Sequence, residues 1–293
     1  MFKIVWFIKG LNSAWNFIKW YTLFFLIVLC FVFFFPDQIY SIQSYSERTQ
    51  TYFQINKFIE TEFCSEPIPL YRPNVQMNLK TEYNKIFKNE ISKEFKNKIQ
   101  YWVPILLPLF INHNLPEDLF YTVFAESLLS NKTSSAGAKG FWQLMPSTGR
   151  LYGLQIDSLI DERLNPIEAT NAAAKCFKDS KKRFPNWTLT LASYNLGTNG
   201  IEREIKKQHT FDFYKMHLNP ETRTFVYKII AYKDLIKKIE LTKLTKPKTV
   251  SFTTSKTISI ADLAIKYKIN ELDLKNLNPW ILRDIIPARK KNY

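Results

Sequence analysis

The chain has 293 residues, of which 46% are hydrophobic and 23% charged. This composition provides enough apolar surface for a folded core and excludes collagen-like, low-complexity and wholly disordered chains. The formal net charge is +15, from Lys and Arg scattered along the chain, so nucleic acid, anionic lipid and acidic cell-wall polymers are all compatible partners. No zinc-finger spacing, RNA-binding aromatic motif or basic zipper is present, and we therefore expect no nucleic-acid binding.

The first segment, residues 1–37, predicts a membrane anchor. Residues 20–35, WYTLFFLIVLCFVFFF, carry no charge and follow three lysines, Lys3, Lys9 and Lys19. The stretch is near the lower length limit of a spanning helix, and the positive-inside rule keeps the lysines in the cytoplasm. Everything after Pro36 is then expected on the periplasmic or extracytoplasmic side of the inner membrane.

Other interpretations of this segment stay open. A cleaved signal peptide needs small residues at its cut site, whereas the stretch ends in FVFFFPD. Lipidation at Cys30 would favour a small residue before it, where the chain has Leu29. A buried core helix fits poorly because the segment is apolar all round.

Three further parts follow the anchor. Residues 38–78 are an expected tether, in which PIPLYRPN should be extended. Residues 79–243 have apolar faces of helical period and brief turn signals, which predict an all-α domain. A Lys-rich linker over 243–248 precedes residues 249–293, where TVSFTT alternates like a strand and two short helices follow. The predicted fold class is mainly α, with a small α+β module at the C-terminal end.

Cysteine and histidine usage argues against metal and disulfide chemistry. Cys30 lies in the hydrophobic segment, so one bridge, Cys64 to Cys176, is conceivable, and two free thiols are favoured. Three scattered histidines, with no His-Glu-x-x-His motif and no Gly-rich phosphate loop, predict neither a metal nor a nucleotide cofactor.

Glu126 stands out as a carboxylate at the edge of an apolar helix face. A helix is expected from Pro116 to about residue 127 or 129, and within it Glu126 borders the stripe that contains Leu119 and Val123. Partial burial raises a carboxyl pKa and keeps some of the group protonated near neutral pH, as a general acid requires. The alternative is a helix-end glutamate that points outward or is satisfied by a backbone or lysine partner.

The residues after this helix suggest a sugar-binding surface. Residues 134–140, SSAGAKG, can turn tightly and leave room beside the helix. Trp142 then offers a flat apolar face, Gln143 a two-way hydrogen bonder and Met145 a flexible filler. Flat faces and amide partners suit a sugar ring.

Together these segments resemble the lytic transglycosylases of the lysozyme-like superfamily, particularly the membrane-bound murein type. Glu126-Ser127 is similar to the catalytic Glu-Ser of that family, and residues 134–143 resemble its Ser-x-Ala-Gly-Ala-x-Gly-(Leu/Phe/Ile)-(Met/Trp)-Gln stretch. LMPSTGRLYGL continues the likeness, and LASYNLGTNG and NPETRTFVYKI are similar to its Ala-(Ala/Ser)-Tyr-Asn-x-Gly and Glu-Thr-x-x-Tyr-Val elements, in the expected order. The likeness spans about residues 95–240.

The resemblance implies cleavage of the β-1,4 bond from N-acetylmuramic acid to N-acetylglucosamine in peptidoglycan, with 1,6-anhydro ends and no cofactor. Glu126 would be the single general acid and base, and the implied substrate contacts are Ser134, Gln143, Met145, Tyr194 and Asn195. Ser134 could equally stabilise its turn, and Tyr194 could be a core residue. Most glycosidases use two carboxylates, but Asp157, Asp161 and Glu162 are expected to be solvated loop charges.

The chain departs from the family pattern at Phe225, where the family has tyrosine. Phenylalanine cannot hydrogen-bond to the carboxylate, and Tyr227 should face elsewhere on its helix, so Tyr194 or a water would have to compensate. Hydrolysis by water, as in goose-type lysozyme, is an alternative, and so is a catalytically weak peptidoglycan-binding or scaffold protein.

The tail, residues 250–280, is similar to a lysin motif, a module that binds N-acetylglucosamine chains. The usual Gly-Asp before Thr257 is replaced by Ser255-Lys256, and little chain remains after Trp280 for a closing strand. A degenerate or purely structural tail is the alternative.

Overall fold

The computed structural model describes residues 61–87, 92–239 and 254–288, all of which belong to one compact unit, Glu60–Tyr293. The expected membrane anchor and most of the expected tether lie outside the described residues. In the described ranges, no helix is both long enough and apolar enough to cross a membrane.

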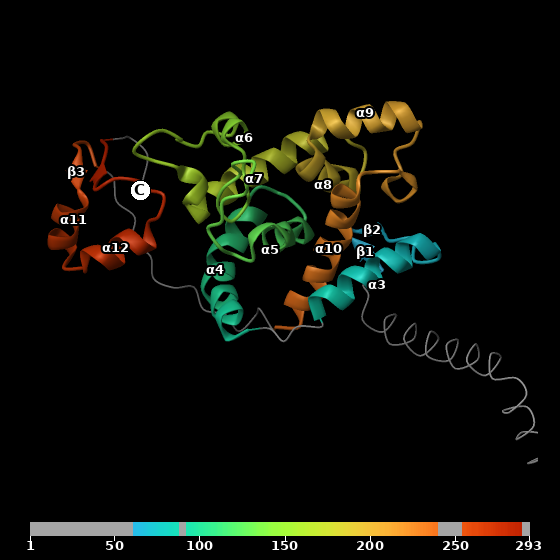
Figure 1. Ribbon diagram of the computed structural model, residues 1–293, viewed down its shortest axis with the longest axis horizontal. Coiled ribbons are helices and arrows are strands. Elements are labelled where there is room, and N and C mark those ends of the chain that lie inside the picture. Colours follow the sequence, from blue (N-terminus) through green and yellow to red (C-terminus); the bar gives the residue numbers. More distant parts are fainter. Residues whose placement is uncertain (1–60, 88–91, 240–253, 289–293) are drawn as a thin grey trace, which may run out of the picture. The chain divides into compact units, whose positions relative to one another are not determined.

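Helices dominate the described chain, and its short strands form two antiparallel pairs (Figure 1). In chain order the elements are β1 (Glu62–Phe63), β2 (Glu66–Pro67), α3 (Pro73–Phe87), α4 (Lys93–Ile111), the 3-10 helix η1 (Glu117–Tyr121), α5 (Thr122–Ser127), α6 (Pro146–Leu151), η2 (Glu162–Leu164), α7 (Pro166–Lys181), α8 (Trp187–Leu196), α9 (Thr198–Gln208), η3 (Phe213–Lys215), α10 (Pro220–Lys237), β3 (Ile258–Ser259), α11 (Ile260–Tyr267), α12 (Glu271–Leu277) and β4 (Ile285–Ile286). The predicted mainly helical fold is confirmed.

Trp142 is at the centre of the helical core. Its indole stacks on Phe110 with ring centroids 5.5 Å apart and an interplanar angle of 6°, and Phe120 packs edge-on against it. Its Nε1 donates a hydrogen bond to Thr170 Oγ1 at 2.8 Å. Both the flat face and the polar atom are therefore used inside the core. The expectation that Trp142 offers a face to a sugar ring is wrong.

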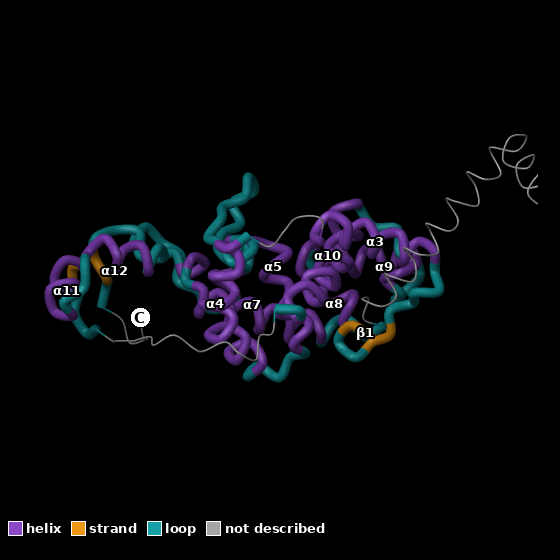
Figure 2. The backbone as a smooth tube through the Cα atoms, turned by 90° about the horizontal axis from the view of Figure 1, so that it is seen from below, coloured by secondary structure: helices purple, strands orange, loops and turns teal. Residues whose placement is uncertain are grey.

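The folded domain begins before residue 79, where the helical part was expected to start. The β1–β2 hairpin leads into α3, which begins at Pro73 and packs against α10 (Figures 1 and 2). The Cys64 N–H donates to Asp118 Oδ2 at 2.6 Å, and Lys233 Nζ lies 2.8 Å from the same oxygen. Residues 61–78, expected as part of the tether, are thus held to the helical domain. The stretch PIPLYRPN is only partly extended, because proline suits the first turn of α3.

The helix expected from Pro116 to residue 127 or 129 is divided in two. It starts as the 3-10 helix η1, in which the Leu119 N–H donates to Pro116 O at 3.2 Å, and continues as α5. α5 ends at Ser127 because Leu128 and Leu129 both adopt left-handed angles, with φ of 56° and 53°.

The loop between α5 and α6 is locked against η2. Gly140 has a φ of +82°, and a Cβ at this position would lie 1.7 Å from the carbonyl oxygen of Arg163. The Arg163 guanidinium donates back to Gly137 O at 2.8 Å and to Leu144 O at 3.2 Å. The loop and η2 therefore hold each other, and no side chain fits at residue 140.

Residues 254–288 form a small module of strand, helix, helix and strand. β3 and β4 pair antiparallel with Ile258 opposite Ile286, and Ile260, Leu263 and Ile286 form the buried core. The sequence predicted the two helices. For a closing strand it left little chain after Trp280 beyond ILRDIIPARK, and β4 lies within that stretch. Most of TVSFTT lies outside the described residues. The likeness of this module to a lysin motif stays a prediction.

We predict that Gly140→Ala destabilises the domain far more than Gly137→Ala. Both glycines have a positive φ, +82° and +85°, so alanine costs about 1 kcal/mol at either position from the backbone alone. Only at residue 140 does the added Cβ meet a backbone atom, and the free energy of unfolding should fall there by about 3 kcal/mol or more. Urea denaturation measures both losses, and equal midpoints for the two variants would contradict the close approach.

Candidate active site

Glu126 lies on the last turn of α5, one residue before the helix ends. Ser127 is buried, and its Oγ donates to Phe141 O at 2.7 Å, which ties the helix end to the following loop. The N–H of the left-handed Leu128 donates to Phe124 O at 3.2 Å. Left-handed angles in residues other than glycine are uncommon and recur at functional sites. The backbone on both sides of Glu126 is thus held in place.

The carboxyl of Glu126 is poised between its two protonation states. Burial raises the pKa of Glu126 to about 7; Lys228 opposes this rise and Glu221 adds to it. Near neutral pH the acid and the carboxylate are therefore both populated. One group can then donate a proton in one step and accept a proton in another.

Lys228 reaches Glu126 from α10. Its Nζ donates to Ala125 O at 2.5 Å, the carbonyl just before Glu126 in the chain. Burial lowers the pKa of Lys228, and the Glu126 carboxylate opposes that effect. The lysine is placed by a backbone carbonyl and acts on the carboxyl through its charge.

One face of α10 is directed at this end of α5. Glu221, Phe225 and Lys228 are spaced i, i+4, i+7, so they share that face. Phe225 is buried between the two charged positions. Its ring adds apolar surface where a tyrosine would add a hydroxyl, which favours the neutral form of a nearby acid.

Asn195 is fixed beside the same face of α10. Its Nδ2 donates to Glu221 Oε1 at 3.1 Å, and its Oδ1 accepts from Thr222 Oγ1 at 2.7 Å. Both ends of the amide are thus oriented by α10. Asn195 lies next to a carboxylate that acts on the pKa of Glu126.

Tyr194 is a half-buried residue that packs against the core and interacts electrostatically with Glu126. Its ring stacks on Phe177 with centroids 4.8 Å apart, and its hydroxyl donates to Trp142 O at 2.8 Å. Burial raises the pKa of Tyr194, and the charge of Glu126 adds to that rise. The hydroxyl therefore stays protonated beside the carboxyl. Tyr227, as expected, faces elsewhere, and its ring packs against that of Phe213.

Ser134, Gln143 and Met145 belong to the loop rather than to the immediate surroundings of Glu126. Ser134 Oγ accepts from the Ala138 N–H at 3.0 Å, which stabilises the turn. Gln143 has a φ of 46°, and its Nε2 donates to Gly140 O at 2.8 Å. Met145 is exposed just before α6. Within the described residues, no hydrogen bond joins any of these three side chains to Glu126.

The sequence predicted that Asp157, Asp161 and Glu162 are solvated loop charges. For Asp161 and Glu162 this prediction is wrong. Asp161 and Glu162 are only 3% and 2% exposed. Asp161 pairs with Arg163 at 2.8 Å, and Glu162 accepts from the Gln155 N–H at 2.7 Å. Burial acts to raise the pKa of Asp161, but Arg163 holds it below its usual value. Asp161 is therefore a buried, charged structural partner of Arg163.

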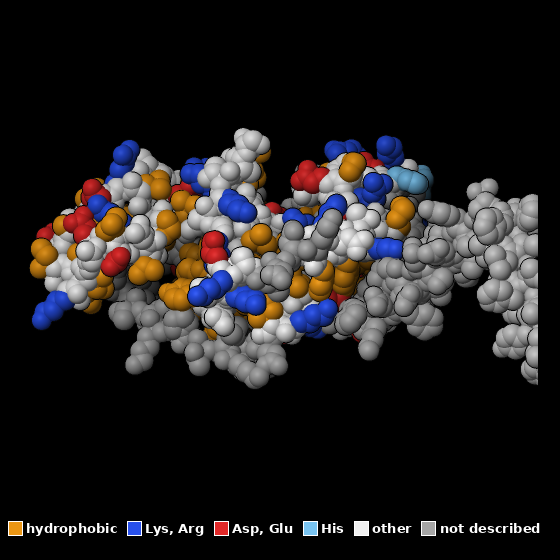
Figure 3. All heavy atoms as spheres, turned by 60° about the horizontal axis from the view of Figure 1, so that its bottom comes forward, with side chains coloured by type: hydrophobic (Ala, Val, Ile, Leu, Met, Phe, Trp, Pro, Cys, Tyr) orange, Lys and Arg blue, Asp and Glu red, His pale blue; other side chains and the backbone are white. Residues whose placement is uncertain are grey.

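Other candidate chemistries find no support near Glu126. Cys64 and Cys176 are free thiols, as the sequence favoured. Across residues 61–87, 92–239 and 254–288, no cluster of His, Cys, Asp and Glu could hold a metal ion. On the face in Figure 3, Lys and Arg lie in scattered positions rather than in one patch.

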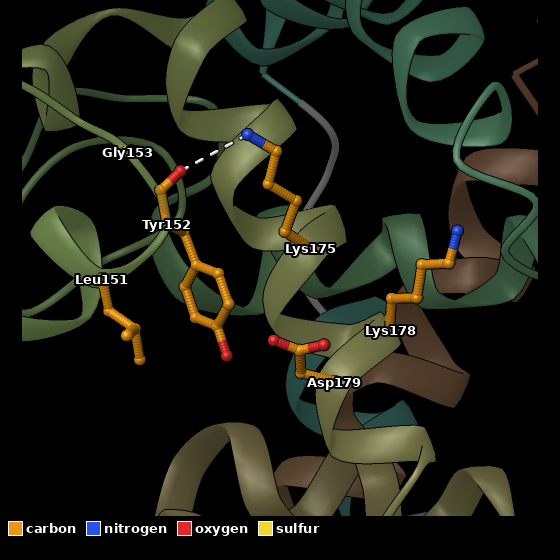
Figure 4. Close-up of a pocket in the computed structure, with 6 residues that line it drawn as sticks. All are labelled: Leu151, Tyr152, Gly153, Lys175, Lys178 and Asp179. Atoms are coloured by element: carbon orange, nitrogen blue, oxygen red, sulfur yellow. Dashed lines mark hydrogen bonds between the residues drawn. The ribbon is translucent and has the colours of Figure 1, made fainter.

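A pocket of about 380 Å³ lies between the end of α6 and α7 (Figure 4). In it Lys175 Nζ donates to Tyr152 O at 3.5 Å, and Asp179 faces the Tyr152 ring. None of its lining residues is among the expected site residues. The pocket is therefore separate from the groups that surround Glu126.

Sequence reasoning missed Lys228 and Glu221 as neighbours of Glu126. Their seven-residue spacing around Phe225 places all three on one helix face. That spacing was a usable signal, because Phe225 was already the point where the chain departs from the family pattern. What the sequence could not provide is the packing of α10 against α5.

We predict that Glu126→Gln becomes more stable relative to the wild type as the pH rises. The folded pKa of about 7 exceeds the ordinary value of 4.5, so the folded wild type binds the extra proton and loses stability as the pH rises through this window. The loss approaches about 3 kcal/mol above pH 7, and glutamine does not incur it.

Urea denaturation at pH 5 and pH 8 measures this difference. Glu94→Gln is the control, because Lys98 lowers the pKa of this exposed glutamate. Its titration therefore lies below pH 5, and its difference from the wild type should not change between pH 5 and pH 8. A pH-independent difference between wild type and Glu126→Gln would show that Glu126 has an ordinary pKa.

Comparison with known proteins places Glu126, Tyr194 and Asn195 within the range of a matched domain. Residues 112–217 match the family model described as "Transglycosylase SLT domain". Over 130 residues the chain is 35% identical to the membrane-bound lytic murein transglycosylase D of Escherichia coli strain K12, and equally to that of strain O6:H1 (CFT073). These alignments cover 42% of this chain and 29% of each relative.

A third relative, a protein named for tributyltin chloride resistance in Alteromonas sp. (strain M-1), is 33% identical over 94 residues, or 31% of this chain and 45% of that protein. The chain thus aligns with less than half the length of each of these relatives. Residues 112–217 thus match a transglycosylase domain, and the two Escherichia coli relatives are named as lytic murein transglycosylases.

Proposed function

We propose that the protein is a lytic transglycosylase that cleaves the β-1,4 bond from N-acetylmuramic acid to N-acetylglucosamine and leaves 1,6-anhydro-N-acetylmuramic ends. The observation that carries this proposal is the pKa of Glu126, about 7, at a rigid helix end in a matched transglycosylase domain. A carboxyl with this pKa can serve as the single acid and base that the reaction needs.

The reaction uses one carboxyl twice, first as an acid and then as a base. Protonated Glu126 gives its proton to the glycosidic oxygen as the bond from muramyl C1 to that oxygen breaks. The substrate's acetamido group stabilises the cation-like C1. The Glu126 carboxylate then takes the proton of the muramyl C6 hydroxyl, whose oxygen bonds to C1 and closes the anhydro ring. No water is consumed, and Glu126 ends protonated as it began.

Nearby residues tune and orient this carboxyl. Lys228 stabilises the carboxylate that forms after the first proton transfer and limits the pKa rise caused by burial. Tyr194 and Asn195, both beside the Glu126 surroundings, are the strongest candidates for sugar contacts. The loop would contact the glycan strand through Ser134, Gln143 and Met145. The Gln143 amide oxygen and the exposed Met145 side chain are available for such contacts.

We further propose that the protein acts on the periplasmic side of the inner membrane. Three lysines ahead of an uncharged 16-residue stretch support an N-terminal anchor with the remaining chain exported. The relatives in Escherichia coli are named as membrane-bound enzymes. Peptidoglycan glycan strands are the partner that this location provides.

We predict that the full-length wild type releases 1,6-anhydro-muropeptides from peptidoglycan sacculi and that Glu126→Gln releases none above background. Loss of an essential acid and base lowers the rate by roughly 100-fold or more. Mass spectrometry of the released fragments reads out the result. Fragments with reducing rather than anhydro ends would indicate hydrolysis, and binding without release would indicate a scaffold protein. Equal release by both variants would remove Glu126 from the mechanism.

We predict that Lys228→Met moves the alkaline limb of the pH profile of kcat/KM to higher pH. The acid form of Glu126 is required, so activity should fall as the pH rises through about 7. Removal of the lysine charge raises the pKa of Glu126 further and extends the active range upward. Lys207→Met, on the exposed surface of α9, removes the same charge elsewhere and should leave the limb unmoved. A shift to lower pH in Lys228→Met would contradict the role given to Lys228.

A further inference from the structure

The C-terminal module is joined directly to the helical domain. Ile281 forms a β-bridge with Ile160. The Asp161 N–H donates to Trp280 O at 2.9 Å, and the Leu282 N–H donates to Leu159 O at 2.8 Å. Trp280 is only 4% exposed. The chain after α12 is thus paired with the loop before η2, which the buried Asp161–Arg163 pair stabilises.

At this junction an open pocket of about 280 Å³ is lined by residues of both parts. The helical domain contributes Trp102 on α4 and the buried Leu129 and Phe141. The module contributes Asn276, Leu277 and Pro279, at and just after the end of α12. A volume near the lower end of ordinary ligand sites suits one or two sugar rings.

The chemistry of the pocket suits an uncharged N-acetylated sugar. Trp102 packs edge-on against Phe141, with centroids 5.2 Å apart, and supplies aromatic surface to the pocket. Within the described residues, neither the Trp102 indole N–H nor the Asn276 amide has a hydrogen-bond partner. Aromatic surface with free amide and indole groups matches the carbon-bound hydrogens and the acetamido group of such a sugar.

The charge at the pocket wall also favours a neutral ligand. Among the described residues that line it, Lys98 is the one that carries a charge. Lys98 Nζ lies 2.7 Å from Glu94 and donates to Ser130 Oγ at 2.8 Å, so its charge is already paired. N-acetylglucosamine carries no charge, whereas N-acetylmuramic acid carries a lactyl group and its peptide.

The pocket is close enough to Glu126 for one glycan strand to reach both. Ser130 lines it and is four residues after Glu126. At about 3.6 Å per residue at most, their Cα atoms lie within about 14 Å. A glycan strand of a few sugar units is long enough to span that distance.

We propose that this interdomain pocket is a binding subsite for an N-acetylglucosamine unit of the peptidoglycan strand, formed only when the C-terminal module is docked. The inference rests on the proposed function for its substrate. In this proposal the C-terminal module takes part in substrate binding because it shares the pocket wall with Trp102, and it does not bind the glycan alone.

Calorimetry measures the affinity of the full-length protein, in detergent, for uncharged N-acetylglucosamine oligomers. Every protein in this test, including the reference, carries Glu126→Gln so that the oligomers are not cleaved. In this background we expect Asn276→Ala and Leu277→Ala each to weaken binding several-fold, up to about tenfold. Trp102→Phe should weaken it as well while keeping an aromatic ring against Phe141. Leu272→Ala is the matched control, because Leu272 and Leu277 are both on α12 and are 65% and 61% exposed, but only Leu277 lines the pocket.

Two results would overturn the subsite. Unchanged affinity in all three pocket variants would exclude it, and weakening by the α12 variants but not by Trp102→Phe would assign binding to the module alone. The proposed function is tested separately by release from sacculi. If the wild type releases fragments but the pocket variants bind oligomers as tightly as their parent, the subsite is wrong and the proposed function stands. If Trp102→Phe weakens oligomer binding but the wild type releases no fragments, the subsite stands and the transglycosylase proposal is wrong.

Discussion

Partial removal of water from one carboxyl, that of Glu126, is the constraint on which the rest of the site depends. A solvated glutamate is ionised at neutral pH and cannot donate a proton. To retain the proton, the group needs an apolar surround that does not relax or admit more water. The hydrogen bond from Ser127 to Phe141 and the left-handed turn at Leu128 provide that rigidity at the helix end.

Asp161 shows the opposite solution within the same domain. Both acids are withdrawn from water, yet Asp161 lies against the Arg163 guanidinium and stays ionised, whereas Glu126 faces a more distant lysine and keeps its proton to about pH 7. Different environments thus shift the pKa values of two acids in opposite directions. The ionised Asp161 orients Arg163, which in turn fixes the loop that begins soon after Glu126.

The sequence predicted local features well and contacts between distant segments poorly. The position of Glu126 at the edge of an apolar stripe and the order of the helices follow from periodicity, which is a local property. The burial of Trp142 could not be read this way, because its partners Phe110 and Thr170 come from other helices. The same holds for Lys228, which reaches Ala125 across 103 residues of chain, and for residues 61–78, which are held by Asp118 and Lys233.

Phe225 has a consequence for the balance between acid and base at Glu126. A tyrosine hydroxyl at this position could donate to the carboxylate and lower its pKa, because hydrogen bonds to the charged form favour that form. Phe225 provides no such donor, and the Tyr194 hydroxyl already donates to Trp142 O. Stabilisation of the carboxylate is therefore left to the charge of Lys228, at a distance set by its bond to Ala125. Where the resembling family has a tyrosine hydroxyl, this chain thus has the charge of Lys228 as the group that opposes the raised pKa of Glu126.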